Sequence, residues 1–183
     1  MPRSGADARR RLREAALELY GEQGYDSTTT AQIAARAGVT ERTFFRHFAD
    51  KREVLFGGDS ELRDTMVGAI AGAAPETSPL DLVVGAYLAA VPLFVAGRPI
   101  AIRRAELIDA TPALQERAHA KTAALADAVV DALMSRGITE PTARLAAQVG
   151  AAAFQRAGAQ WYADPSLDLP TLVRDAVDEV RRL

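Results

Sequence analysis

The chain has 183 residues, of which 49% are hydrophobic and none is cysteine, and its formal net charge is −2 at pH 7. This length allows one large domain, or a small domain attached to a larger one. The lack of cysteine excludes disulfides, a thiolate nucleophile and a cysteine-ligated metal.

The charge is unevenly distributed along the chain. Residues 1–55 hold ten Lys and Arg against eight Asp and Glu, and the remainder holds twelve against sixteen. Five of these arginines fall within the first thirteen residues, next to a single acid. Such a run fits DNA contact and also fits an ordinary solvated helix face.

Neither a signal peptide nor a membrane span is expected from the sequence. The first 25 residues are charged and lack an apolar h-region. The longest apolar run, residues 82–97, is shorter than the roughly 18–20 residues of a span, and Pro92 interrupts it. We therefore expect a buried helix here, no membrane partner and a cytoplasmic location.

Helix signals begin at the N-terminus, and the alternation typical of strands is missing. A first helix is expected over residues 6–23, ended by Gly24. Thr29 to Gln32 fits a capping box that opens a short helix ending at residue 37. Thr40 is expected to cap another short helix over residues 41–48.

The two short helices, joined by a turn at Gly38, predict a helix-turn-helix. A helix of this length needs tertiary anchors. Phe44 and Phe48 lie four residues apart on one face and are expected to supply them. Phe45 lies about 100° around the helix, toward the solvent boundary.

The exposed face of the second short helix is expected to carry polar and basic side chains. Arginine can grip guanine in two places, and threonine can reach a base edge or a thymine methyl. His47, Lys51 and a following helix N-terminus could contact phosphates. Each of these side chains could also be merely solvent-facing. The set on this face is Glu41, Arg42, Thr43, Arg46 and His47.

The segment GYDSTTTAQIAARAGVTERTFFRHFADKREVL, residues 24–55, resembles the DNA-binding domain of TetR-type transcriptional repressors. The matching elements are G-Y, T-T before a short I-A helix, A-G-V-T, an aromatic pair, H-F and a following Lys. The resemblance implies that Thr28 and Thr29 lie near phosphate and that Lys51 contacts it. It places Thr40, Glu41, Arg42 and Thr43 at the base-reading start of the second short helix. The family's usual tyrosine is Phe45 here, so its phosphate contact is lost or replaced by packing against the backbone.

Caps and breaks predict six further helices. They span residues 51–73 (capped by Asp50), 79–96, 100–109, 112–136, 140–163 and 170–183. The expected fold is all-α, with nine helices. An N-terminal helix-turn-helix domain, residues 1–52, would precede a ligand-binding and dimerisation domain, residues 53–183.

No catalytic constellation is evident in the sequence. The two histidines, His47 and His119, fall in different expected domains, and no nucleotide-, zinc- or nucleophile-bearing motif is present. We expect neither an enzyme nor a cofactor.

One face of the expected helix over residues 140–163 is lined by small residues, which permit close helix approach, and one face of the helix over residues 170–183 is an apolar seam. These two faces predict a homodimer interface. The alternative is that both faces serve the core of a single chain. The predicted interface residues are Ala147, Gly150, Ala151, Phe154, Gly158, Leu172, Val173, Ala176 and Val180.

A small, mostly apolar effector is expected among the helices of the second domain, from apolar bulk with few polar groups. The candidate lining residues are Met66, Tyr87, Phe94, Arg103, Glu106, Phe154 and Trp161, and each could instead be core or solvated.

The sequence thus predicts a repressor that binds a palindromic double-stranded operator as a dimer and is released by the effector. The alternative is a ligand-independent DNA-binding activator or architectural protein whose body only dimerises. A helical enzyme or a protein-interaction module would leave the basic N-terminal segment unexplained.

Overall fold

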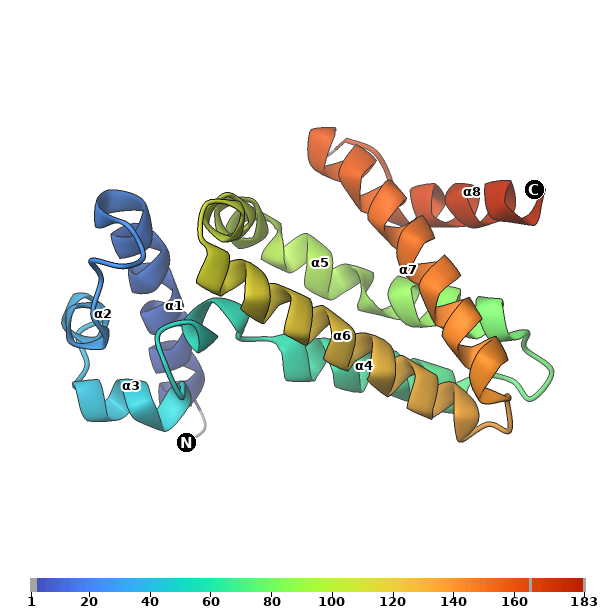
Figure 1. The fold of residues 1–183 in the computed structure, drawn as a ribbon, viewed down its shortest axis with the longest axis horizontal. Helices are drawn as coiled ribbons and strands as arrows, with labels where there is room; N and C mark the ends of the chain where they lie inside the picture. The colour runs from blue at the N-terminus through green and yellow to red at the C-terminus, as the bar shows by residue number, and fades with distance from the viewer. Residues whose placement is uncertain (1–2, 165, 183) are drawn as a thin grey trace. The chain divides into compact units, whose positions relative to one another are not determined.

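The computed structural model describes residues 3–164 and 166–182, and these contain α-helices and one short 3-10 helix but no strand. The all-α fold class is thereby confirmed. Leu183, where the last helix was expected to end, lies outside the described residues. In chain order the elements are α1 (Arg3–Gln23), α2 (Thr30–Arg36), α3 (Glu41–His47), η1 (Glu53–Phe56), α4 (Asp59–Gly72), α5 (Pro79–Asp109), α6 (Pro112–Met134), α7 (Glu140–Ala163) and α8 (Leu169–Arg181) (Figure 1).

The chain divides into two compact units, each of which is made of two separate segments of the sequence. The first, here called the head unit, holds Met1–Asp59 and Pro99–Ala120. The second, the body unit, holds Ser60–Arg98 and Lys121–Leu183. Both α5 and α6 therefore contribute residues to each unit. The functional boundary predicted after residue 52 stays a prediction.

The head unit is built around α1, against which α2 and α3 pack (Figure 1). Its core also takes side chains from the end of α5 and the start of α6, far along the chain. Leu114 is fully buried in this cluster, and Leu107 and Ile108 pack against it. The larger core side chains from the N-terminal segment are Leu12, Tyr20, Ile33, Phe44, Phe48, Leu55 and Phe56.

Local signals fixed the helix ends of the head as expected. The Thr29 side chain accepts from the Gln32 N–H while the Gln32 side chain accepts from the Thr29 N–H, which completes the capping box. The Thr40 hydroxyl caps α3 by accepting from the Thr43 N–H. Gly38 has a φ of +67°, so the turn uses the left-handed conformation that glycine adopts without strain.

The continuous helix predicted over residues 51–73 was wrong. The Asp50 carboxylate does cap a helix, accepting from the N–H groups of Arg52 and Glu53 at 2.8 and 3.0 Å. That helix is only the 3-10 turn η1. Gly57 and Gly58 follow it, and Gly58 has a φ of +115°, outside the helical region. A new helix, α4, then begins at Asp59.

The break predicted between residues 96 and 100 was also wrong, because α5 runs unbroken through this segment. A proline inside a helix removes one backbone donor and bends the helix, but the hydrogen bonds on either side can persist. By length and composition alone, Pro79–Arg98 would suffice to cross a bilayer. Core helices pass the same test, and this segment buries Val83, Ala86 and Ala90 in the body.

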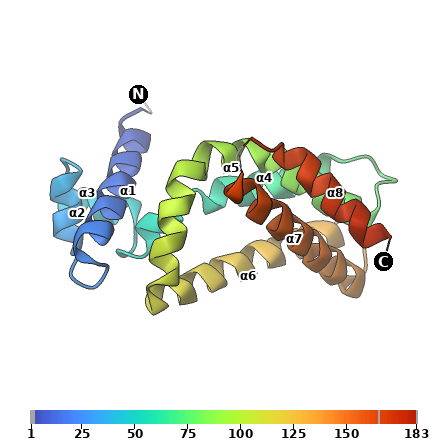
Figure 2. The ribbon, with the colours of Figure 1, turned by 90° about the horizontal axis from the view of Figure 1, so that it is seen from above.

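In the body unit, α8 lies across α7 and beside the first part of α5 (Figure 2). Gly150 on α7 makes room for the Val83 side chain of α5, because an added Cβ would lie 2.4 Å from Cγ1 of Val83. The end of α4 is held by Arg136, whose guanidinium donates to the carbonyl oxygens of Ile70 and Ala73, both at 2.9 Å. These contacts leave one side of α7 and one side of α8 facing solvent.

Candidate nucleic-acid interface

Two buried rings hold α3 against the head core. Phe44 is 0% exposed and Phe48 is 4% exposed, and their ring centroids lie 5.7 Å apart. The predicted anchoring role of both residues is confirmed. Phe45 is 53% exposed and meets Phe44 edge-on at 5.4 Å. One face of this seven-residue helix therefore fixes it, and the adjacent side presents a large ring to solvent.

The outward face of α3 carries two arginines without a carboxylate partner. Arg42 and Arg46 are exposed and make no ion pair within the described residues. Glu41, beside them, accepts a hydrogen bond from the Thr30 hydroxyl on α2. Thr43 is half-buried, and its hydroxyl lies 3.0 Å from that of Thr40. The two guanidinium groups thus remain available to an anionic ligand.

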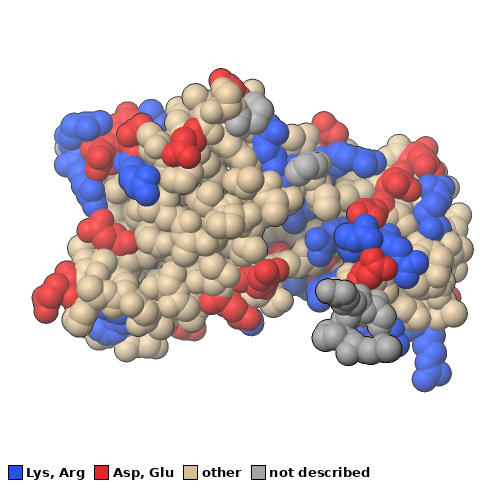
Figure 3. All heavy atoms as spheres, turned by 180° about the vertical axis from the view of Figure 1, so that it is seen from behind, with Lys and Arg blue, Asp and Glu red and all other residues tan. Residues whose placement is uncertain are grey.

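Two other arginines of the head, Arg36 and Arg10, are already paired with acids. Arg36 on α2 binds Glu22 at 2.9 Å and Glu18 at 3.3 Å, which ties α2 to α1 and lowers the pKa of the Glu22 carboxyl. Arg10 pairs with Asp7 and Glu14 within α1. Figure 3 shows the result on one face, where basic side chains around the head alternate with acidic ones. Pairing thus neutralises part of the positive charge on α1 and α2, whereas Arg42 and Arg46 on α3 keep theirs.

The ammonium of Lys51, expected to contact phosphate, is bound to carbonyl oxygens within the head. Its ammonium donates to the carbonyl oxygens of Tyr25 and Thr28, at 2.9 and 3.2 Å, and lies 4.2 Å from the centroid of the Tyr25 ring. Its own carbonyl accepts from the Tyr20 hydroxyl at 2.6 Å. Lys51 thereby fastens the turn between α1 and α2.

Thr28 also faces inward. It is 1% exposed, and its hydroxyl donates to the Gly24 carbonyl at 2.8 Å. The side chain therefore closes the turn after α1, and our proposed phosphate contacts exclude it. Thr29, next in the chain, is exposed at the start of α2.

His47 is half-buried at the end of α3, and its Nε2 has no hydrogen-bond partner within the described part of the chain. Burial lowers the pKa of His47, and the nearby Arg46 and Arg9 lower it further. The imidazole is therefore kept neutral near pH 7, when no phosphate is close. Arg9 itself lies over the Phe48 ring, 5.3 Å from its centroid.

Two family models match the chain at the places where this geometry lies. The model described as "Bacterial regulatory proteins, tetR family" matches residues 12–56, and the "MftR C-terminal domain" model matches residues 77–183. The chain belongs to the TetR family. It is a DNA-binding transcriptional regulator with a helix-turn-helix head.

The curated relatives match only the N-terminal part of this TetR-family regulator. It is 42% identical to the HTH-type transcriptional regulator TcmR of Streptomyces glaucescens over 78 residues, which are 43% of this chain and 34% of TcmR. SrpR of Pseudomonas putida is 45% identical over 49 residues, 27% of this chain and 23% of SrpR. The matched part is thus about a third or less of these two relatives' own length.

Solved structures match nearly the whole TetR-family chain at low identity. NalD, the secondary repressor of the MexAB-OprM multidrug efflux pump in Pseudomonas aeruginosa, has a TM-score of 0.63 and 21% identity, covering 98% of this chain and 97% of NalD. Thermus thermophilus FadR, in complex with lauroyl-CoA, has a TM-score of 0.56 and 22% identity, covering 93% and 91%. These similarities establish the fold.

The residues expected to line an effector pocket do not all come together. In the body unit, the rings of Tyr87 and Phe154 stack at 4.4 Å, and Phe94 lies 4.6 Å from Phe154. Burial raises the pKa of the Tyr87 hydroxyl, which therefore stays protonated as a hydrogen-bond donor. This half-buried aromatic stack is the part of the predicted set that the fold assembles.

The other four members are not part of the stack, although Met66 and Trp161 belong to the buried clusters against which Phe94 packs. Met66 is 0% exposed in the core, and Trp161 is 5% exposed beneath the Arg98 guanidinium. Arg103 and Glu106 are exposed and belong to the head unit. We therefore leave these four out of the proposed effector site.

Many of the predicted dimer residues are covered within the single chain. Val173 and Ala176, of the seam on α8, pack in a core cluster with α5 and α7. Gly150 makes room for the Val83 side chain of α5, and Phe154 belongs to the aromatic stack. Further members of the set that are buried are Ala147 and Gly158, and those half-buried are Ala151, Leu172 and Val180.

The opposite side of α7 carries the exposed surface that sequence reasoning missed. From Leu145 to Ala163 the exposed positions of α7 carry one charged side chain, Arg156, which is paired with Glu179 at 2.7 Å. Because α7 has small residues on both of its sides, the sequence pattern did not indicate which side would be buried within the chain. The uncharged exposed residues along this side are Leu145, Gln148, Ala152, Gln155, Ala159 and Ala163.

Proposed function

We propose that this TetR-family regulator is a repressor that binds a palindromic operator as a dimer and releases it when a small, mostly apolar molecule binds the body. The observation that carries the DNA part is the outward face of α3. Arg42 and Arg46 are unpaired there beside the exposed Phe45, while buried Phe44 and Phe48 hold the helix in place.

The two arginines and their neighbours would make two kinds of DNA contact, to base edges and to the sugar–phosphate backbone. Arg42 and Thr43, near the start of α3, are proposed to read base edges together with Thr40. Arg46, His47 and the exposed Thr29 are proposed to contact phosphates. Phe45 would pack against the sugar–phosphate backbone, and Glu41 would orient α2 against α3. Each good base contact should discriminate by about 1–3 kcal/mol.

A second copy of the chain is the proposed occupant of the uncharged side of α7. Helix-turn-helix heads of this kind bind two half-sites, which requires two copies. Exposed small and apolar residues such as Leu145, Ala152 and Ala159 would allow two α7 helices to approach. The exposed side of α8, by contrast, carries charged residues, including Asp175, Asp178 and Arg182, and suits the rim.

The aromatic stack of Tyr87, Phe94 and Phe154 is the proposed effector contact. Its polarity supports an apolar ligand with one hydrogen-bonding group, which the protonated Tyr87 hydroxyl would meet. The lauroyl-CoA bound to Thermus thermophilus FadR, a ligand with a long apolar chain, supports the same class.

Release of DNA would pass through the ends of α5 and α6 that belong to the head unit. Because η1 and the two glycines after it interrupt the expected lever over residues 51–73, another connection is needed. Arg104 of α5 donates to the Leu55 carbonyl, and Arg117 of α6 binds Glu53. A ligand that favours a different placement of these helices would move η1, and with it the spacing of the two recognition helices.

Selection of bound duplexes from a random DNA pool tests the proposal. We expect a palindrome with half-site centres about 34–36 Å apart. Arg42→Ala and Thr43→Ala should change the selected sequence, while Arg46→Ala should weaken all sequences alike and reduce the salt slope by about 0.9. An unaltered operator with Arg42→Ala and Thr43→Ala would show that α3 does not read bases.

The ligand-independent alternative predicts a different calorimetric result. In the repressor mechanism, operator DNA weakens effector binding by the same factor as effector weakens operator binding. Titrating a candidate effector into free protein and into the protein–operator complex measures this factor. Equal affinities would favour the alternative. Both mechanisms place the protein in the cytoplasm, with its DNA.

A further inference from the structure

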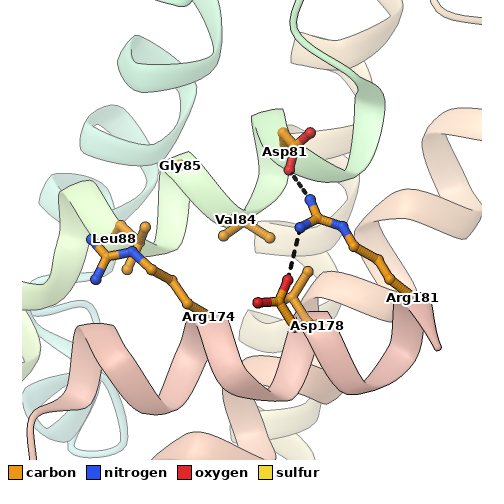
Figure 4. A pocket seen from close by; sticks show the side chains of 8 residues that line it. Asp81, Val84, Gly85, Leu88, Arg174, Asp178 and Arg181 are labelled. Carbon is orange, nitrogen blue, oxygen red and sulfur yellow. Dashed lines mark hydrogen bonds and ion pairs between the residues drawn. The ribbon is translucent and has the colours of Figure 1, made fainter.

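A hollow of about 350 Å³ opens between the first part of α5 and α8, within the body unit (Figure 4). Its floor is apolar, formed by Val84, Leu88 and Val177, and Gly85 leaves space on the α5 side. A Cβ added at Gly85 would meet no other atom within 4 Å. This volume is at the small end of ligand sites in proteins. The aromatic stack contributes no residue to it.

The two ends of the hollow carry opposite charge. Arg174 lies at one end, beside Leu88, and makes no ion pair within residues 3–164 and 166–182 (Figure 4). At the other end Arg181 binds both Asp81 and Asp178 (Figure 4). Two carboxylates around one guanidinium leave that end with a net charge of about −1 at neutral pH.

Hydrogen bonding at the acidic end leaves one acceptor free. The oxygens of Asp81 are taken by Arg181 and by the Ser78 hydroxyl, which donates at 2.6 Å. Asp178 uses Oδ1 for Arg181 at 2.9 Å. Its Oδ2 has no partner within the described chain, so it can accept from a ligand cation.

The spacing of the charges follows from helix geometry. Arg174 and Asp178 are four residues apart on α8, a rise of about 6 Å, and Arg174 and Arg181 are separated by about 10 Å along the axis. A cation and an anion held about 6–10 Å apart by an apolar linker would match both ends and the floor.

We infer that this hollow binds a small zwitterion, with a carboxylate on Arg174, an ammonium on Asp178 and an aliphatic chain over Val84, Leu88 and Val177. Opposite charges at the two ends give such a ligand an orientation. A simple anion would pair only with Arg174, and a simple cation only with Asp178. Either would leave the charge at the far end of the hollow without a partner. Binding of such a ligand by the 183-residue chain does not depend on operator release.

The test uses ε-aminocaproate as probe, with caproate and hexylamine as single-charge controls. Saturation-transfer NMR and calorimetry on the full-length protein should show binding of the zwitterion, at least tenfold tighter than either control. Arg174→Gln should reduce this preference to less than threefold. No binding of ε-aminocaproate, or equal binding of all three compounds, would overturn the inference.

Gly85 offers a variant that fills the hollow without disturbing the fold. Gly85→Leu places a side chain in open space and replaces glycine by a better helix former, so the variant should fold. It should abolish binding of the probe. Gly68→Leu is the matched control, because Gly68 is also an exposed helical glycine with no atom within 4 Å of an added Cβ. That variant should bind like the wild type.

Two outcomes of this comparison would count against the site. Binding that survives Gly85→Leu would show that the probe binds elsewhere. If Gly85→Leu instead dissociates the dimer in sedimentation while Gly68→Leu does not, the hollow is covered by a second copy, and the ligand assignment is wrong.

Discussion

The ammonium of Lys51 lies 4.2 Å from the centre of the Tyr25 ring and donates to the Tyr25 carbonyl at 2.9 Å. One side chain thus holds both the ring and the backbone of a single turn residue. This turn, between Gly24 and Thr28, leads directly into α2, so the contact helps to fix where α2 begins. We expect the head to depend on this contact before any DNA is bound.

Replacing Lys51 by Met keeps the aliphatic stem and removes the donors. Hydrogen bonds to a charged group are worth about 1.5–3 kcal/mol, less where solvent reaches them. We expect the free energy of unfolding to fall by about 1–3 kcal/mol in urea. Arg42→Met, on an exposed side chain, should change it by less than about 0.5 kcal/mol. An unfolding free energy unaffected by Lys51→Met would mean that the turn is fixed by other contacts.

The two neighbouring phenylalanines should separate stability from DNA binding. Phe44→Ala empties a site that is 0% exposed and should cost about 3–5 kcal/mol of stability. Phe45→Ala removes a ring that is 53% exposed and should cost far less, but it should weaken operator binding at least severalfold. Chemical denaturation and fluorescence anisotropy measure the two effects. Equal loss of stability in both variants would contradict the burial seen here.

The dimer surface is tested on the outer side of α7. Ala152→Glu places a charge on this exposed side and should give a folded monomer, because a charge buried between two copies costs several kcal/mol if unpaired. Ala152→Ser is the control and should remain a dimer. Val173→Asp, by contrast, buries a charge within one chain and should unfold the body. Sedimentation velocity and circular dichroism distinguish these results. A dimeric Ala152→Glu variant would exclude this side of α7 as the interface.

His47 makes head stability depend on pH. Its folded-state pKa is lowered below the usual 6.5, so the unfolded chain binds the proton more readily. The stabilising contribution is therefore fully present above about pH 6.5 and is lost as the pH falls from there through the lowered value. The melting temperature should fall more for the wild type than for His47→Gln between about pH 7.5 and about pH 5.5. His119→Gln, at an exposed position, should behave like the wild type. Parallel pH profiles of the wild type and His47→Gln would refute this role.

Features that depend on neighbours in the chain could be predicted from the sequence. The capping box at Thr29, the cap at Thr40 and the anchors Phe44 and Phe48 each follow from residue types at fixed spacing. The family likeness rests on the same segment. The resemblance placed Lys51 at a phosphate, yet the carbonyls that it binds are about 25 positions away in sequence, and no local pattern reveals that contact.

Features that depend on distant packing could not be predicted in the same way. An apolar seam such as the one through Val173 looks the same whether it faces its own chain or a partner. The unbroken α5 could not be predicted because the helix that contains Pro99 packs along its length against three apolar clusters, whose other members are distant in the sequence. The sequence shows that Arg36 is basic, but its ion pair with Glu22 on α1 could not be predicted, because the pair forms only when α2 packs against α1.

The composition of the head core has a consequence for synthesis on the ribosome. Leu114 completes the same apolar cluster as Leu55 and Phe56, and it is made about sixty residues later. At roughly 5–20 residues per second, the delay is about 3–12 s. During that interval the nascent head lacks part of its core and exposes apolar side chains. A truncated chain that stops at Asp59 should therefore be prone to aggregate, although it contains every residue proposed to touch DNA.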